Sequence, residues 1–347
     1  MALVMACGAR TGLDVDDGLR EATALDVGAD APADTSDANS SSPCPSTRVI
    51  VHQPWADDNA DGIDQILVAG SDVYFHSEGV WHTSITGGAI DYVGGGDENW
   101  PQLSLFDVSA TDVFWVDSIG TSSTSEVMSA ARGGGLPNLV ATIPFTDADS
   151  VILANGGLYA WDNGSDDPPG AVAFVATNGT VTVLSPLPAN TQRMVISGPT
   201  LYVGATQGLF AWDGASSLTK LTSIKVADLA LDGDSIVFTE GFDSGNEAPL
   251  SVWREPLIGG DPVPLVSDYS DLLGGIAVDN ASVYFVDRGG SIVRITKESG
   301  VVTVIASAET GYQAEAVALD DRCVYFTATA VSGLSTVREN QVYISAK

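Results

Sequence analysis

The sequence has few cations, few cysteines and no long hydrophobic run. Lys and Arg number 14 among 347 residues, against 45 Asp and Glu, which gives a formal net charge of −31. No run reaches the about 18 apolar residues that a membrane-spanning helix needs. A surface this acidic repels phosphate backbones and anionic headgroups, which excludes nucleic acid as a partner. The acidity could attract cations or basic ligands, but we favour its simpler role in solubility.

Common catalytic motifs are missing as well. The chain contains no Gly-x-Ser-x-Gly elbow, no His-Glu-x-x-His, no phosphate loop and no Cys-x-x-Cys. These absences give no support to the familiar hydrolase, metalloprotease, nucleotide-binding and redox classes. We therefore predict no catalytic residue.

What the chain does contain is a short aromatic strand pattern that recurs seven times, about every 42 residues. The copies are Val73-Tyr74-Phe75, Val113-Phe114-Trp115, Leu158-Tyr159-Ala160, Leu201-Tyr202-Val203, Ile236-Val237-Phe238, Val283-Tyr284-Phe285 and Val324-Tyr325-Phe326. Repeats of this length with several strands each are typical of β-propeller blades. Glycines at the expected turns between third and fourth strands suit tight hairpins. We predict an all-β, seven-bladed propeller of four-stranded blades over residues 47–347.

The last repeat has only three strands of its own, which predicts how the ring closes. An open sheet edge is a pairing liability, and residues 47–52 can supply the missing fourth strand. Cys44 and Cys323 would then lie in one blade, where a disulfide could join them across a very long loop. The alternative is two unpaired cysteines.

Two of the repeats resemble a known group of propellers. Val113-Phe114-Trp115-Val116-Asp117 and Val283-Tyr284-Phe285-Val286-Asp287 are similar to the Tyr-Trp-Thr-Asp strand of YWTD and NHL-type blades. The resemblance covers the chain from about residue 64 to its end, at the level of blade pattern. It implies the fold and little about activity, because propellers serve both enzymes and binding modules.

The N-terminal residues predict an anchored protein. Val4-Met5-Ala6-Cys7-Gly8 resembles a bacterial lipobox, which implies lipidation of Cys7. Only six residues precede Cys7, fewer than a signal peptide needs, so either the chain starts upstream or the match is chance. Residues 8–46 are acidic and poor in apolar residues, as in a disordered tether. We expect residues 1–7 to be a truncated lipoprotein signal and the protein to be an extracytoplasmic monomer, touching a membrane only through its lipid.

An acidic segment before the first blade resembles half of a calcium loop. Asp57, Asn59 and Asp61 alternate before Gly62, as oxygen ligands do around Ca²⁺. The twelfth position, where the loop needs a bidentate acid, is Val68, so Asp64 would have to substitute for it. The alternative is a polar connecting loop, and Ca²⁺ is the one cofactor that the sequence suggests.

The three histidines fall in the closing strand or the first blade. His76 or His82 could serve as a base or metal ligand. Because these two and His52 do not surround the propeller axis, we favour ordinary strand histidines.

Long loops between second and third strands, together with blade-joining loops, emerge on one face of a propeller. Exposed aromatics beside carboxylates suit a protein or carbohydrate partner. The candidate residues of this binding face are Trp100, Asp162, Asp166, Asp167, Asp243, Glu247, Tyr269 and Tyr312.

Two functions follow. The first is a surface-anchored or secreted module that binds a protein or saccharide. The second is an extracellular hydrolase or lyase with a metal in the central channel. The inner strands are mostly apolar and small, with few potential metal ligands, which favours binding.

Overall fold

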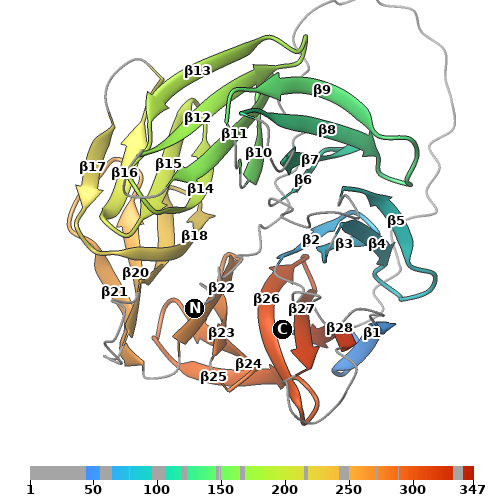
Figure 1. Cartoon of the computed structure of the whole chain (residues 1–347). Coiled ribbons are helices and arrows are strands. Elements are labelled where there is room, and N and C mark those ends of the chain that lie inside the picture. Colours follow the sequence, from blue (N-terminus) through green and yellow to red (C-terminus); the bar gives the residue numbers. More distant parts are fainter. Residues whose placement is uncertain are drawn as a thin grey trace, which may run out of the picture.

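The protein is described by a computed structural model of the 347-residue chain. It describes residues 44–54, 65–77, 79–95, 106–118, 123–145, 148, 150–164, 169–214, 218–241, 250–269, 272–287, 289–330 and 339–347. These residues form seven four-stranded antiparallel sheets arranged as a ring (Figure 1). The predicted seven-bladed propeller is confirmed. Within the described ranges no helix is long and apolar enough to cross a membrane.

Each of the first six blades is a meander whose strands run outward from the ring centre in chain order. Blade one is formed by β2 (Gln65–Ala69), β3 (Asp72–His76), β4 (Val80–Ser84) and β5 (Asp91–Gly94). Blade two is formed by β6 (Asp107–Val108), β7 (Asp112–Ser118), β8 (Ser125–Ala131) and β9 (Asn138–Ile143). Blade three is formed by β10 (Ser150–Ala154), β11 (Gly157–Gly164), β12 (Pro169–Ala176) and β13 (Val181–Pro186). Blade four is formed by β14 (Thr191–Ser197), β15 (Thr200–Ala205), β16 (Gly208–Trp212) and β17 (Thr219–Thr222). Blade five is formed by β18 (Val226–Asp232), β19 (Ser235–Glu240), β20 (Leu250–Pro256) and β21 (Val263–Tyr269). Blade six is formed by β22 (Leu272–Val278), β23 (Ser282–Asp287), β24 (Ser291–Thr296) and β25 (Val302–Ser307).

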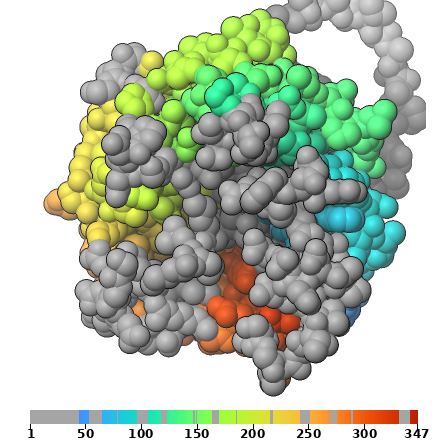
Figure 2. Space-filling model, in the orientation of Figure 1, coloured from blue at the N-terminus to red at the C-terminus, as the bar shows by residue number. Residues whose placement is uncertain are grey.

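The seventh blade joins the two ends of the described chain. Its sheet has the order β1-β28-β27-β26, built from β1 (Arg48–Pro54), β26 (Tyr312–Leu319), β27 (Cys323–Ala330) and β28 (Glu339–Ala346). β1 lies antiparallel to β28, with Arg48 opposite Ile344 and Pro54 opposite Glu339. In Figure 2 the colours run round the ring from blue through green and yellow to red. The predicted closure by an N-terminal strand is confirmed, and the strand runs to Pro54 rather than ending at residue 52.

The recurring aromatic strand is the second strand of every blade and lies at the centre of the core. Phe75, Trp115, Phe285 and Phe326 are fully buried. They pack between neighbouring blades, so one cluster joins Phe75 of the first blade, Phe326 of the last and Tyr284 of the sixth. Full burial of one such side chain contributes about 1.5–3 kcal/mol, which explains why the pattern repeats.

The tyrosines of this strand carry a second role through their hydroxyl groups. Tyr74 donates to the backbone oxygen of Arg132 in the next blade at 3.3 Å, and Tyr202 donates to that of Leu257 at 3.1 Å. In the sixth blade Tyr284 instead donates to Asp279 in the turn before its own strand, at 3.1 Å. Burial and the neighbouring Asp279 raise the pKa of Tyr284 to about 12. These hydroxyls therefore remain protonated donors at physiological pH.

Candidate functional site

A small cavity is lined mainly by residues of the inner strands. It has a volume of about 30 Å³, room for about two water molecules. The lining residues come from the first five blades: Gln65, Leu67, Phe106, Asp107, Val151, Ile152, Trp161, Arg193, Met194, Val195, Leu229, Ala230 and Leu231. The walls are mostly apolar, with a few polar groups near them.

Two of the polar side chains that line this cavity bind the backbone of the next blade. Gln65 exchanges two hydrogen bonds with Phe106, each of 2.9 Å. Asp107 accepts the amide of Leu153 at 2.8 Å. Buried polar groups are stable only when they are bonded. These bonds therefore join the first blade to the second and the second to the third.

Asp228 makes the corresponding link from the fifth blade to the sixth. Its carboxylate accepts the amide of Leu229 at 2.8 Å and that of Ile276, in the sixth blade, at 3.0 Å. The Nε of Arg193, from the fourth blade, lies 3.9 Å from Oδ1. Three blades therefore meet at one fully buried carboxylate.

The environment of Asp228 changes its acidity. Burial raises the pKa of its carboxyl to about 6, while Arg193 and the two amide donors oppose the rise. A raised pKa beside a cavity is common in acid–base sites. Here both oxygens are bonded to backbone and the side chain is 0% exposed, so the geometry favours a structural role.

Sequence reasoning did not single out these polar residues, although a pattern was present. Gln65, Ser150, Arg193 and Asp228 each stand directly before an apolar run of an inner strand. They occupy equivalent positions opposite the second strands. Gln65 lies opposite His76, Ser150 opposite Trp161, Arg193 opposite Gly204, and Asp228 opposite Thr239. Their chemistry differs from blade to blade, which hides the repeat.

Most of the predicted site residues lie outside the described residues. These are the lipidation residue Cys7, the calcium candidates Asp57, Asn59, Asp61 and Asp64, and the binding-face residues Trp100, Asp166, Asp167, Asp243 and Glu247. Among the described residues no group of three or more His, Cys, Asp or Glu could hold a metal.

The three described binding-face residues do not lie on loops. Asp162 is part of β11, opposite Ala171. Tyr269 ends β21 and packs edge-on against Phe285 of the next blade, with 5.3 Å between ring centroids. Tyr312 begins β26 and packs against the core. The loop placement of all three was wrong, because the strands extend into the predicted loops. Their role in binding stays a prediction.

The three histidines are not among the residues that line the cavity. His52 is exposed on β1 and its Nδ1 is 3.3 Å from Nε2 of Gln341. His76 is buried at the end of β3. His82 stacks on Tyr74 with 5.5 Å between centroids. No described histidine lines the cavity.

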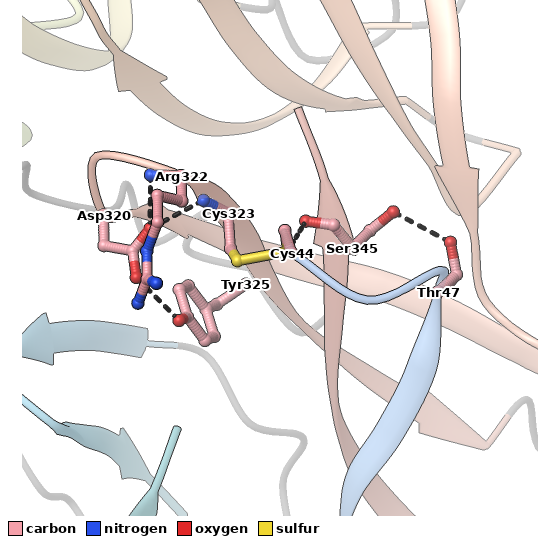
Figure 3. Close-up of a disulfide and its surroundings, with 7 residues drawn as sticks. All are labelled: Cys44, Thr47, Asp320, Arg322, Cys323, Tyr325 and Ser345. Atoms are coloured by element: carbon pink, nitrogen blue, oxygen red, sulfur yellow. Dashed lines mark hydrogen bonds between the residues drawn. A yellow bond between two sulfur atoms is a disulfide. The ribbon is translucent and has the colours of Figure 1, made fainter. Parts of the chain in front are cut away.

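Cys44 and Cys323 form a disulfide next to the closing strand (Figure 3). Their Cα atoms are 5.6 Å apart across a sequence separation of 279. The turn before Cys323 is held by Asp320, which accepts the amides of Arg322 and Cys323 and the hydroxyl of Tyr325. On the other side, the hydroxyls of Thr47 and Ser345 are 2.8 Å apart. Both ends of the bridge are thus positioned by local bonds.

Comparisons with known proteins give the fold. No protein-family model and no curated protein matches the sequence. Among solved structures, oligogalacturonate lyase from Vibrio parahaemolyticus is similar with a TM-score of 0.60 and 9% identity, over 86% of this chain and 97% of that one. The propeller domain of the Trilobed protease from Pyrococcus furiosus, described as having an open velcro topology, gives 0.56 and 11%, over 81% and 97%. The computationally designed Ika8 protein gives 0.56 and 14%, over 82% and 83%. The chain is therefore similar in fold to propellers of very different roles.

Proposed function

We propose that the protein works outside the cytoplasm as a binding module for a protein or a saccharide. The binding face is the one on which the loops between second and third strands emerge. The observation that carries this proposal is the inner ring, where Gln65, Asp107 and Asp228 bind neighbouring blades around a cavity of about 30 Å³. A ring whose blades are joined by such hydrogen bonds is a rigid support, and ligands often bind on loops held by rigid supports.

The compartment is inferred from the disulfide. Disulfides persist in oxidising surroundings and are rare in the cytosol. Cys44 and Cys323 are joined, which supports export from the cytoplasm. The lipobox-like Cys7 would attach the exported chain to a membrane.

Lipidation can be tested directly. When the full chain is expressed in a bacterium fed radiolabelled palmitate, we expect label in the protein and its loss in Cys7→Ser. The matched control is Cys44→Ser, which removes a different cysteine and should keep the label. An unlabelled wild-type chain, expressed with any upstream leader that its reading frame encodes, would contradict lipidation.

Binding can be tested on an array of neutral, basic and acidic saccharides with the full chain. We expect neutral or basic sugars to bind, because the acidic surface repels polyanions. Binding should weaken in Asp243→Asn/Glu247→Gln. Asp261→Asn, in an exposed turn between third and fourth strands, is the matched control.

The competing hypothesis of a metal-dependent lyase gives a different result. It predicts a tightly held metal in stoichiometric amount and turnover of oligogalacturonate, the substrate of the Vibrio lyase. Metal analysis of the purified protein and an unsaturated-product assay would detect both. That outcome would overturn the proposal of a binding module.

A further inference from the structure

Four of the turns between third and fourth strands cover the outer strand of the preceding blade. In four places, a Cβ atom added to a turn glycine would lie 3.0–3.5 Å from a carbonyl oxygen of that strand. The pairs are Gly87 with Ile50 of β1, Gly134 with Tyr92 of β5, Gly179 with Val140 of β9, and Gly300 with Leu265 of β21. All four glycines have positive φ, so other residues would be strained there as well as crowded.

The seventh blade cannot provide such a turn. Its third strand, β28, and its fourth strand, β1, come from distant parts of the chain, so no hairpin joins them. The strand that this hairpin would cover is β25, the outer strand of the sixth blade. Among the described residues, closing the ring with β1 therefore leaves β25 without the kind of turn that covers β1, β5, β9 and β21.

The side chains of β25 are correspondingly exposed. Val302 is 37% and Val304 56% exposed, and Val301, just before the strand, is 55% exposed. No charged residue occurs between Glu298 and Glu309. A long, uncharged, apolar edge strand is a template for pairing with another chain.

Other outer strands carry features that discourage pairing. Natural sheets protect their edges with proline, charged residues or short strands. β5 is four residues long and begins with Asp91, β13 ends at Pro186, β17 contains Lys220, and β21 contains Pro264. β9 lies beneath the turn of Gly179. Among the described outer strands, β25 combines length, exposure and the absence of these features.

We propose that β25 is a docking edge for an extended segment of a partner protein, which adds a fifth strand to the sixth blade. Backbone hydrogen bonds would supply affinity, and alternating apolar residues of the partner would pack beside Val302 and Val304. This surface is distinct from the loop face.

Charge identifies the chemistry of that segment. Glu298 and Glu309 are exposed at the two ends of the strand. The neighbouring Lys297 is engaged with Asp232 and does not neutralise them. A partner segment with basic residues at both ends is therefore complementary. A second copy would place Glu near Glu, and residues 8–43 of this chain are themselves acidic.

The test uses the full chain and a synthetic peptide that alternates valine and threonine between two pairs of lysine, with binding measured by fluorescence anisotropy. We expect Val304→Lys to weaken binding roughly tenfold, through lost apolar contact and added like charge. Glu298→Gln/Glu309→Gln should weaken it roughly threefold to tenfold. The double variant Glu298→Gln/Glu309→Gln changes only exposed side chains. It can therefore test the proposal even if Val304→Lys folds poorly.

The matched control is Val183→Lys on β13, where the native valine is 52% exposed. It should bind the peptide as wild type does, and a glutamate-flanked peptide should bind weakly to all variants. Equal loss in Val183→Lys, equal binding of the two peptides, or no binding by the wild-type chain would overturn the proposal. Self-association of the wild type that Val304→Lys abolishes would overturn it too, since the occupant would then be a second copy.

Discussion

Replacing both Cys44 and Cys323 with serine is expected to lower the free energy of unfolding by about 4–5 kcal/mol in the ideal chain-entropy treatment of long loops. The bridge joins residues 279 positions apart, so it removes a large part of the conformational freedom of the unfolded chain. It also ties the closing strand to β27, two strands away across β28. Without it, β1 is held by its pairing with β28, by side-chain packing and by side-chain hydrogen bonds such as that of Arg48 to the backbone oxygen of Thr86.

Urea denaturation followed by tryptophan fluorescence measures this loss, with and without reductant. The wild type should become equal to the double variant once it is reduced. Cys7→Ser is the matched control, because it removes the third cysteine and leaves the bridge. If reduction leaves the unfolding midpoint unchanged, the bridge does not stabilise the ring.

Replacing Asp228 with alanine is expected to cost about 3–5 kcal/mol, the usual loss when one partner of a buried ion pair is removed. The amides of Leu229 and Ile276 lose their acceptor, and Arg193 loses a nearby negative charge. Asp228→Asn should cost less, since one amide keeps an oxygen. Asp234→Ala is the matched control: it lies near Arg254, its side chain is 95% exposed, and its loss should stay below about 0.5 kcal/mol. A loss no larger than that of the control would contradict the role of Asp228.

The pH dependence of stability tests the same residue. Because the folded pKa of Asp228 is about 6, above the unfolded value, the native state takes up its proton first as the pH falls. The contribution of Asp228 to stability therefore rises between about pH 7 and pH 4, by up to about 3 kcal/mol. Subtracting the profile of Asp228→Asn isolates this rise from the other carboxylates. Parallel profiles would show that the pKa is not raised.

The sequence predicts the ring because every blade repeats the same strand and turn pattern. An aromatic strand at a spacing of about 42 residues, with glycine at the turns, specifies a four-stranded blade. The missing strand of the last repeat then predicts pairing of residues 47–52 with β28, which brings Cys44 beside Cys323. Each step rests on local pattern and on the need to leave no open edge.

The polar contacts between blades could not be predicted in the same way. Gln65, Asp107 and Asp228 bond to backbone atoms about 40 to 50 residues away, and nothing local to each residue indicates its partner. Tyr269 looks like a loop aromatic in the sequence, yet its ring packs on Phe285 of the following blade. Such contacts depend on how neighbouring blades are set against each other, which a single repeat does not reveal.

The closing strand also sets the order in which the protein can mature. β1 leaves the ribosome first, but its partner β28 begins only at Glu339, so the first strand made has to wait for almost the last. Contacts between such distant residues form slowly. During that delay β1 lacks its partner strand, and Cys44 lacks its disulfide partner Cys323. Formation of the Cys44–Cys323 bond therefore reports that the two ends of the ring have come together.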